Sequence, residues 1–382
     1  AARAAQRRAA ATRPDHCFPA RLEEIEVLES AMRRDPADAR APYYLGNLLY
    51  DRRRHAEAME LWERSARLDP SLATVWRNLG IGEYNVRRRP RKARDRYERA
   101  IRCDPFDARL VYERDQLWKR TGVGPERRLV ALRAQVPALE RRDDLCLEYC
   151  ALLNQTGRHA EAESLLRGRR FQPWEGGEGV ALAEHVRTQL ALGYEALGRG
   201  DAVDARDRFR AALDVPANLG EARHLLANPS PVHWALGLAY ERLGDRQAAR
   251  GHWELAAGFV GDFQDMRPRG FSETTYYSAL AWGKLGRPSR RATLLKRLAQ
   301  HAGELAEAPA TIDYFATSLP TMLLFDDDPK ARQTTTALLL EAQAAWGLGH
   351  RTRALSLCRR VLRRDPNHGP ALDFRRHLAF LS

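Results

Sequence analysis

Apolar residues recur at intervals of three and four positions through most of the chain, the spacing that gathers them on one face of an α-helix. Short turns rich in Gly, Pro and Arg separate these blocks. One stretch in the middle, residues 171–179, has no such period. The pattern therefore predicts an all-α protein with two long arrays of amphipathic helices and one loop between them.

The dipeptide Asp-Pro marks a repeat in the N-terminal part of the chain. It stands at 35–36, 69–70 and 104–105, so that successive copies are 34 and 35 residues apart, and it occurs again at 365–366. Proline ends a helix because it lacks a backbone N–H and its ring clashes with the preceding turn. A period of this length fits a unit of two antiparallel helices.

Small and aromatic residues fall at matching positions within these units. Each unit has a glycine in its first helix, then an alanine and an aromatic residue in its second: Gly46, Ala58 and Trp62; Gly80, Ala93 and Tyr97; Gly237, Ala249 and Trp253. In this pattern the chain resembles the tetratricopeptide repeat (TPR) proteins. The resemblance implies an α-solenoid, a right-handed superhelix in which small residues let paired helices approach and an aromatic ring fills the space beside them.

Turn and cap signals give the expected elements. Gly244 is expected to close its turn in the left-handed conformation, and Ser230-Pro231 to begin a helix. The expected segments are one helix at 21–34, pairs at 41–68, 74–103 and 108–134, helices at 143–155 and 158–167, pairs at 181–213, 231–258, 273–300 and 311–348, a final unit that turns at Gly349, and a capping helix at 371–381.

Four regions follow from these segments. They are a basic, disordered tail at 1–20, a first TPR array at 21–168, an inserted loop at 169–179, and a second TPR array at 180–382. The helix at 371–381 is expected to shield the last open apolar face, because each unit buries its core only by stacking on a neighbour. The chain begins with Ala, so we expect a processed chain or a piece of a longer one.

The central loop concentrates side chains that could carry chemistry. Three glycines and a proline in residues 171–179 exclude a helix, since Gly costs about 1 kcal/mol and Pro about 3 relative to Ala. The candidate catalytic residues there are Glu175 and Glu178, because two carboxylates held about 5 to 9.5 Å apart can process a glycoside. Glu178 could equally stabilise the N-terminus of the following helix. Phe171 and Trp174 could contact a ligand or pack between the arrays.

First helices line the inner surface of a TPR array, so their residues that face away from the Leu-Gly side are candidate binding residues. Tyr, Asn and Arg suit the backbone and carboxylate of a peptide or the hydroxyls of a sugar. Packing inside the helix pair is the alternative for the tyrosines. The residues selected in this way are Tyr43, Asn47, Tyr50 and Asp51 in one unit and Arg77, Ile81, Tyr84 and Asn85 in the next.

Four segments outside the repeat pattern carry a narrower resemblance. They are residues 41–51, 171–179, 218–226 and 312–320. Together they resemble the C-terminal repeat regions of large bacterial proteins whose N-terminal half is a domain of unknown function similar to a galactose-mutarotase-like β-sandwich. This resemblance implies an adjacent β-sandwich domain and a carbohydrate-related accessory role. It carries over no catalytic residue.

Composition narrows the functional classes. The formal net charge is +13, but only five of the 63 basic residues are lysines, a bias typical of genomic base composition. Nucleic acid is therefore the least favoured partner. No Cys-x-x-Cys, Gly-x-Gly-x-x-Gly or phosphate-loop motif occurs, so no cofactor is expected. His55, His159 and His350 fall in turns and are expected to point to solvent rather than to hold a metal.

Cysteine usage and hydropathy bear on the compartment. The five cysteines lack paired spacing, and Cys146 and Cys150 are four residues apart on one expected helix, so we expect reduced thiols. No apolar run reaches the roughly 18 residues of a membrane span, and residues 1–13 lack the apolar segment of a secretory signal. These features predict a cytoplasmic protein.

Two functions of different classes remain. The first is a non-catalytic scaffold that binds a protein, a peptide or an adjacent β-sandwich domain, with carbohydrate as a further candidate ligand. The second is a carbohydrate-active enzyme module in which Glu175 or Glu178 takes part in glycoside processing. The helical array favours the scaffold. The common cofactor motifs are also absent from the sequence, which gives the enzyme module less support.

Overall fold

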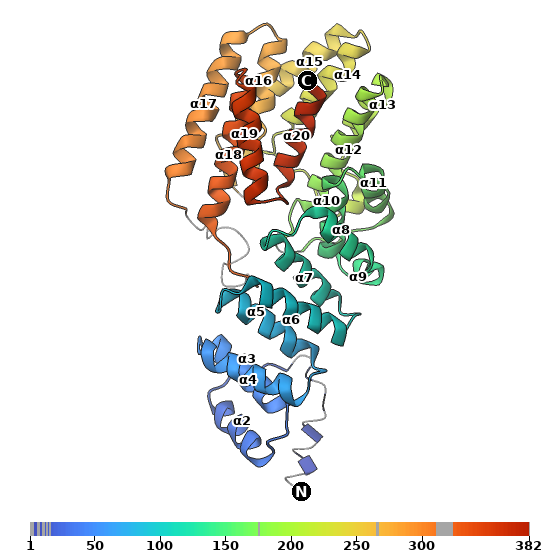
Figure 1. Ribbon diagram of the computed structural model, residues 1–382. Helices are drawn as coiled ribbons and strands as arrows, with labels where there is room; N and C mark the ends of the chain where they lie inside the picture. Colours follow the sequence, from blue (N-terminus) through green and yellow to red (C-terminus); the bar gives the residue numbers. More distant parts are fainter. Residues whose placement is uncertain are drawn as a thin grey trace. The chain divides into compact units, whose positions relative to one another are not determined.

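The computed structural model describes residues 4–5, 8–9, 12, 14, 17–174, 176–264, 267–310 and 324–381 (Figure 1). Most of these residues lie in helices that are joined by short turns and paired in antiparallel hairpins. The fold is all-α, a TPR-type α-solenoid, as the sequence predicts. Among the described helices, none is both long and apolar enough to cross a membrane.

The chain forms two compact units. Unit 1 comprises Ala1–Thr121 together with the short segment Leu324–Asp326, and unit 2 comprises Gly122–Leu323 and Asp327–Ser382. The assignment of residues 21–168 and 180–382 to two repeat arrays stays a prediction.

Unit 1 contains two complete hairpins. Helices α3 and α4 form the first, and α5 and α6 form the second. Helix α2 packs before them on α3, and α7 follows on α6. The bounds are α2 (Glu23–Arg34), α3 (Arg40–Asp51), α4 (His55–Leu68), α5 (Ala73–Asn85), α6 (Pro90–Cys103) and α7 (Ala108–Arg120).

Unit 2 contains the remaining elements. Its hairpins include α12 with α13, α14 with α15, α16 with α17 and α18 with α19. The bounds are α8 (Pro125–Arg133), α9 (Val136–Arg141), α10 (Asp143–Gln155), α11 (His159–Gly168), α12 (Val180–Gly198), α13 (Ala202–Ala211), the 3-10 helix η1 (Ala217–Leu219), α14 (Ser230–Arg242), α15 (Arg246–Gly258), β1 (Asp262–Gln264), β2 (Arg267–Arg269), α16 (Thr275–Lys284), α17 (Pro288–Glu307), α18 (Pro329–Gly347), α19 (Arg351–Arg364) and α20 (Gly369–Leu381).

Several segments differ from the expected elements, among them the short helices α9 and η1, which were not predicted. The antiparallel hairpin of β1 and β2, with Asp262 opposite Arg269, was not predicted, because three-residue strands are too short to show a period. Within the pair expected at 311–348, the described residues from Pro329 to Gly347 form the single helix α18, which pairs with α19. The rest of that pair, residues 311–323, lies outside the described residues.

The predicted glycine and aromatic positions are confirmed as the points where paired helices meet. A Cβ added to Gly46 would lie 2.6 Å from the Trp62 ring, and one added to Gly237 would lie 2.1 Å from Trp253. The alanine beside each contact is buried; for example, Ala58 is 0% exposed. Each ring occupies the volume that a side chain would otherwise fill, so the hairpin closes without a void.

Hairpin turns of unit 2 use glycine in the left-handed conformation. Gly244 has a φ of 81°, as predicted, and Gly157, Gly200, Gly286 and Gly349 have φ values from 70° to 91°. In unit 1, Arg53 and Arg88 take the left-handed position, with φ values of 64° and 54°. This conformation is costly for a residue with a Cβ.

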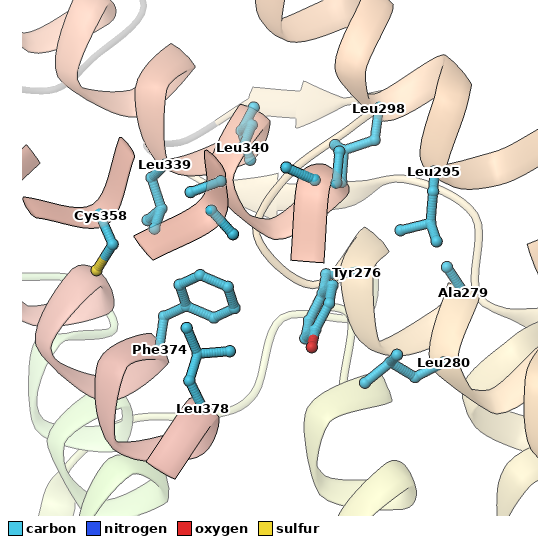
Figure 2. Packing of buried hydrophobic residues seen from close by; sticks show 14 of the residues in the cluster. Tyr276, Ala279, Leu280, Leu295, Leu298, Leu339, Leu340, Cys358, Phe374 and Leu378 are labelled. Carbon is cyan, nitrogen blue, oxygen red and sulfur yellow. The ribbon is translucent and has the colours of Figure 1, made fainter. Parts of the chain in front are cut away.

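Helix α20 does more than cap the last hairpin. Its Phe374 and Leu378 face Tyr276 of α16 in a core that α18 and α19 also line (Figure 2). At the start of α20, Asn367 accepts a hydrogen bond from Arg128 of α8 at 2.9 Å and donates one to the Val123 carbonyl at 2.9 Å. The first and last helices of unit 2 therefore meet, which local sequence patterns did not predict.

Replacing Gly237 with Ala should lower the free energy of unfolding by about 1–3 kcal/mol, because the new methyl group would displace Trp253. Urea denaturation followed by far-UV circular dichroism measures this change. The matched control is Gly251→Ala in α15, where an added Cβ meets nothing within 4 Å. The control should be neutral or stabilising by up to about 1 kcal/mol. Equal stability of the two variants would contradict the close packing.

Candidate functional site

Unit 2 encloses a cavity of about 1300 Å³, called here the α12–α20 cavity. Its walls come from α12, α20, the loop 222–227, Phe263 of β1 and Tyr277 of α16. Helix α12 contributes an apolar stripe with one residue per turn: Leu182, Val186, Leu190 and Tyr194. Pockets for small ligands have volumes of roughly 300–1,000 Å³, so this cavity has room for a larger group.

An ion pair joins the two helical walls. Arg187 of α12 donates to Asp373 of α20 at 2.7 Å and to Glu184 at 2.8 Å. Burial disfavours the charge on Arg187, but Asp373 and Glu184 more than offset this effect, so the pKa of Arg187 is raised. Burial also raises the pKa of Glu184, although Arg187 acts in the opposite direction. The Arg187–Asp373 pair holds α20 against α12, whereas Glu184 pairs with Arg187 within α12 itself.

His377 brings unpaired polar atoms to the cavity wall. Its side chain is 4% exposed, and its ring lies 5.6 Å from Tyr194 and 5.4 Å from Tyr277, measured between ring centroids. Neither ring nitrogen of His377, nor the hydroxyl of Tyr194, has a hydrogen-bond partner among the described residues. Burial lowers the pKa of His377 to about 4, so the imidazole is neutral at pH 7.

His159 also borders the cavity, contrary to the prediction that it points to solvent. It is 4% exposed, and its Nδ1 lies 3.1 Å from Asn154 Oδ1. Burial, with a further contribution from Arg376 of α20, lowers its pKa to about 4. The prediction was wrong because α20 covers a hairpin turn that the local sequence leaves open.

The mouth of the cavity exposes apolar side chains. His224 stacks on Phe263 with centroids 3.6 Å apart, and Arg223 donates a hydrogen bond to the Ala212 carbonyl at 2.8 Å. These two contacts hold the loop 222–227 against its surroundings. In the residues that follow, Leu225 is 99% exposed and Leu226 is 58% exposed. Neighbouring exposed leucines beside a cavity are typical of a protein-docking surface.

The central loop contributes one candidate residue to the cavity rim. Glu178 borders the cavity and accepts a hydrogen bond from the Gly176 N–H at 2.9 Å. Glu175 lies outside the described residues. Phe171 is 1% exposed, and its N–H donates to the Asn218 carbonyl at 2.8 Å. Trp174 is partly buried and packs over Gly177, where an added Cβ would lie 1.9 Å from the indole.

Glu221 is a structural residue that the sequence reasoning missed. Its carboxylate accepts hydrogen bonds from the Gly179 N–H at 3.1 Å and the Leu182 N–H at 3.0 Å. It therefore has the role at the α12 N-terminus that Glu178 was considered for. Its only signal in the sequence was the segment 218–226, which stood outside the repeat pattern.

Three of the predicted inner-surface residues make contacts within unit 1. Tyr43 is 6% exposed in the core. Asn47 Oδ1 accepts hydrogen bonds from Trp62 at 3.0 Å and Asn78 at 2.8 Å. Arg77 forms two hydrogen bonds to the Glu113 carboxylate, at 2.6 and 2.7 Å. A partner could reach these polar groups only by displacing those contacts.

Four of the five remaining predicted inner-surface residues come together, whereas Asp51 is exposed and pairs with the adjacent Arg52. The cluster around Phe325 includes Ile81 and Tyr84 of α5 and Tyr50 of α3. Asn85 of α5 donates a hydrogen bond to the carbonyl of the neighbouring Leu324. The Tyr50 ring also packs at a tilt against Trp62, with 5.1 Å between centroids. That these residues of the first helices bind a partner stays a prediction.

No protein-family model matches the chain. Solved structures with similar helical architecture include YrrB, described as a TPR protein with an unusual peptide-binding site, at 17% identity and a TM-score of 0.34 over 62% of this chain and 93% of that one. A TPR protein from Parabacteroides merdae is 13% identical, with a TM-score of 0.33 over 62% of this chain and 85% of its own. A chain in the structure of Naa15/Naa10 bound to HypK-THB is 14% identical, with a TM-score of 0.35 over 93% and 59% respectively.

Replacing His377 with Phe should flatten the dependence of stability on pH. Burial holds the pKa of His377 at about 4, below its ordinary 6.5, so between these values the unfolded chain binds a proton that the folded chain does not. The contribution of the neutral His377 to the free energy of unfolding is fully present above pH 6.5 and is lost as the pH falls toward 4.

Urea denaturation at pH 7 and pH 5 tests this prediction. The His377→Phe chain should lose about 2 kcal/mol less than the wild-type chain between the two pH values. His350→Phe, at an exposed turn, is the control and should behave as the wild type. An unchanged pH dependence in the His377 variant would contradict the burial of a neutral imidazole.

Proposed function

We propose that the chain is a non-catalytic scaffold that binds a protein partner, and that the α12–α20 cavity receives an apolar segment of that partner. The observation that carries this proposal is the open apolar stripe of α12 beside a mouth where Leu225 is 99% exposed. Burial of apolar side chains contributes roughly 25 cal/mol per Å², so a partner that covers these groups gains affinity from their removal from water.

The polar groups of the cavity suit orientation rather than attraction by charge. Arg187 and Asp373 neutralise each other, and Arg376 donates to the Gln155 carbonyl. The His377 ring nitrogens and the Tyr194 hydroxyl have no hydrogen-bond partner among the described residues, but they are buried, so a bound segment would have to move neighbouring side chains to reach them. A few placed polar groups in an apolar cavity fix the orientation of a bound ligand.

The alternative of a glycoside-processing enzyme has less support. Glu178 is the described member of the proposed carboxylate pair, and its hydrogen bond to the Gly176 N–H gives it a role in the loop turn. The finer proposals, an adjacent β-sandwich domain as the partner and a carbohydrate-related role, rest on the sequence resemblance alone. We also propose a reducing, cytoplasmic compartment, because all five cysteines are free thiols.

Filling the cavity should abolish partner binding. A random peptide library displayed on phage, selected against the full chain, should yield apolar peptides that bind the wild type. Ala191 of α12 lines the cavity, so the indole of Ala191→Trp would occupy the space and weaken these peptides at least about tenfold, a loss of about 1.4 kcal/mol.

Ala160→Trp is the matched control, because Ala160 is exposed on α11 and does not line the cavity. It should bind the selected peptides as the wild type does. Circular dichroism confirms that each variant keeps its helices. Peptides that bind Ala191→Trp and the wild type equally would refute the cavity as the binding site.

A further inference from the structure

A three-residue segment far along the chain belongs to unit 1. Leu324, Phe325 and Asp326 are assigned to unit 1, whereas the next residue, Asp327, belongs to unit 2 and pairs with Arg332 at 2.7 Å. Nearly all other residues of unit 1 lie before position 122. Unit 1 therefore holds a short piece of chain that arrives from outside its own repeats.

A single side-chain amide binds the backbone on both sides of Phe325. Asn85 Nδ2 donates to the Leu324 carbonyl at 2.9 Å, and Asn85 Oδ1 accepts from the Asp326 N–H at 3.0 Å. These bonds need only backbone groups of the segment, so a peptide of another sequence that takes the same backbone bend can also make them. In peptide recognition, hydrogen bonds to the main chain of the peptide contribute affinity, and pockets for its side chains contribute selectivity.

Phe325 is the buried anchor of the segment. It is 1% exposed and lies 5.4 Å from the Tyr84 ring in an edge-on arrangement and 5.8 Å from the Tyr97 ring. Ile81 and Leu117 complete the apolar wall, and the Arg120 guanidinium lies 5.9 Å from the centre of the Phe325 ring. An aromatic side chain in a desolvated pocket is the usual source of most of the affinity at a peptide interface.

An ion pair lies at the rim of this pocket. Arg88 pairs with Asp326 at 2.7 Å, with side chains 66% and 49% exposed. Arg88 occupies the left-handed turn position that glycine fills in the hairpins of unit 2. The turn therefore accepts an unfavourable backbone conformation for a residue whose side chain reaches the segment. Rim pairs of this kind add specificity more than affinity.

From these contacts we infer that unit 1 carries a second binding site, specific for a peptide of the form apolar–Phe–Asp, and that the chain's own segment Leu324–Asp326 occupies it. We call this site the Phe325 seat; it consists of Ile81, Tyr84, Asn85, Arg88, Tyr97 and Leu117. Its ligand is a protein segment with a large aromatic side chain followed by an acidic one. The seat is separate from the α12–α20 cavity and does not depend on it.

The internal segment is a competitor for such a partner. A ligand tethered to its site has an effective concentration on the order of millimolar, so a free peptide must exceed that competition to bind. Removing the anchor from the internal segment leaves the seat itself unchanged. The full chain with Phe325→Ala should therefore bind an added peptide that the wild type binds poorly.

The probe is a fluorescein-labelled peptide with the sequence of residues 322–328, Met-Leu-Leu-Phe-Asp-Asp-Asp. Fluorescence anisotropy at 150 mM NaCl measures its Kd. We expect the Phe325→Ala chain to bind the peptide at least about tenfold more tightly than the wild type. Binding no tighter than the wild type, with the helical signal intact, overturns the inference.

A second chain keeps the test decisive if Phe325→Ala loses its helices. Asp326→Arg places a positive charge opposite Arg88 and weakens the internal segment from the rim, without leaving a hole in the pocket. This chain should also bind the peptide more tightly than the wild type. Failure of the peptide to bind Asp326→Arg overturns the inference.

A charge exchange shows where the peptide binds. In the Phe325→Ala chain, adding Arg88→Glu should weaken the peptide at least about tenfold, and a peptide with Lys in place of the first of its three Asp residues should recover the loss. Adding Arg91→Glu instead, at an exposed position on α6, makes the same change of charge and should leave binding unaltered. Equal effects of Arg88→Glu and Arg91→Glu overturn the assignment of the seat.

Discussion

The close contact between a helical glycine and an aromatic ring of the paired helix is the constraint on which this structure depends. A Cβ added to Gly80 would lie 2.6 Å from the Tyr97 ring, and one added to Gly193 would lie 2.2 Å from Phe209. The ring fills the volume that the glycine leaves, so the two helices pack at the density of a protein interior. A closed hairpin still has one apolar face, which only the next hairpin can bury.

This way of closing each hairpin leaves other parts of its first helix available for contacts outside the pair. In unit 2, α12 is the first helix of its hairpin, and its Val186 and Leu190 line the α12–α20 cavity. In unit 1, α5 is the first helix of its hairpin, and its Tyr84 and Asn85 contact Leu324–Asp326. Both sites therefore use the first helix of a hairpin, but at different positions along it: Val186 and Leu190 precede the hairpin glycine by seven and three residues, whereas Tyr84 and Asn85 follow theirs by four and five.

The hairpins could be predicted because their determinants are local. Gly237 and Trp253 are 16 residues apart, and the pattern that links them recurs with the repeat. The contacts that shape the sites are not local. His159 is buried by α20, which lies some 200 residues further along the chain, and Asn85 binds Leu324 across 239 positions. A periodic pattern states which face of a helix is free, but it carries no information about which distant segment occupies that face.

A double-mutant cycle on Gly193 and Phe209 measures the central contact most directly. Gly193→Ala alone should lower the free energy of unfolding by about 1–3 kcal/mol, because its methyl group would overlap the ring. In the Phe209→Leu background, where the ring is absent, the same change should cost much less. The account predicts a coupling free energy of at least about 1 kcal/mol between the two positions. Additive effects, within about 0.5 kcal/mol, would contradict it.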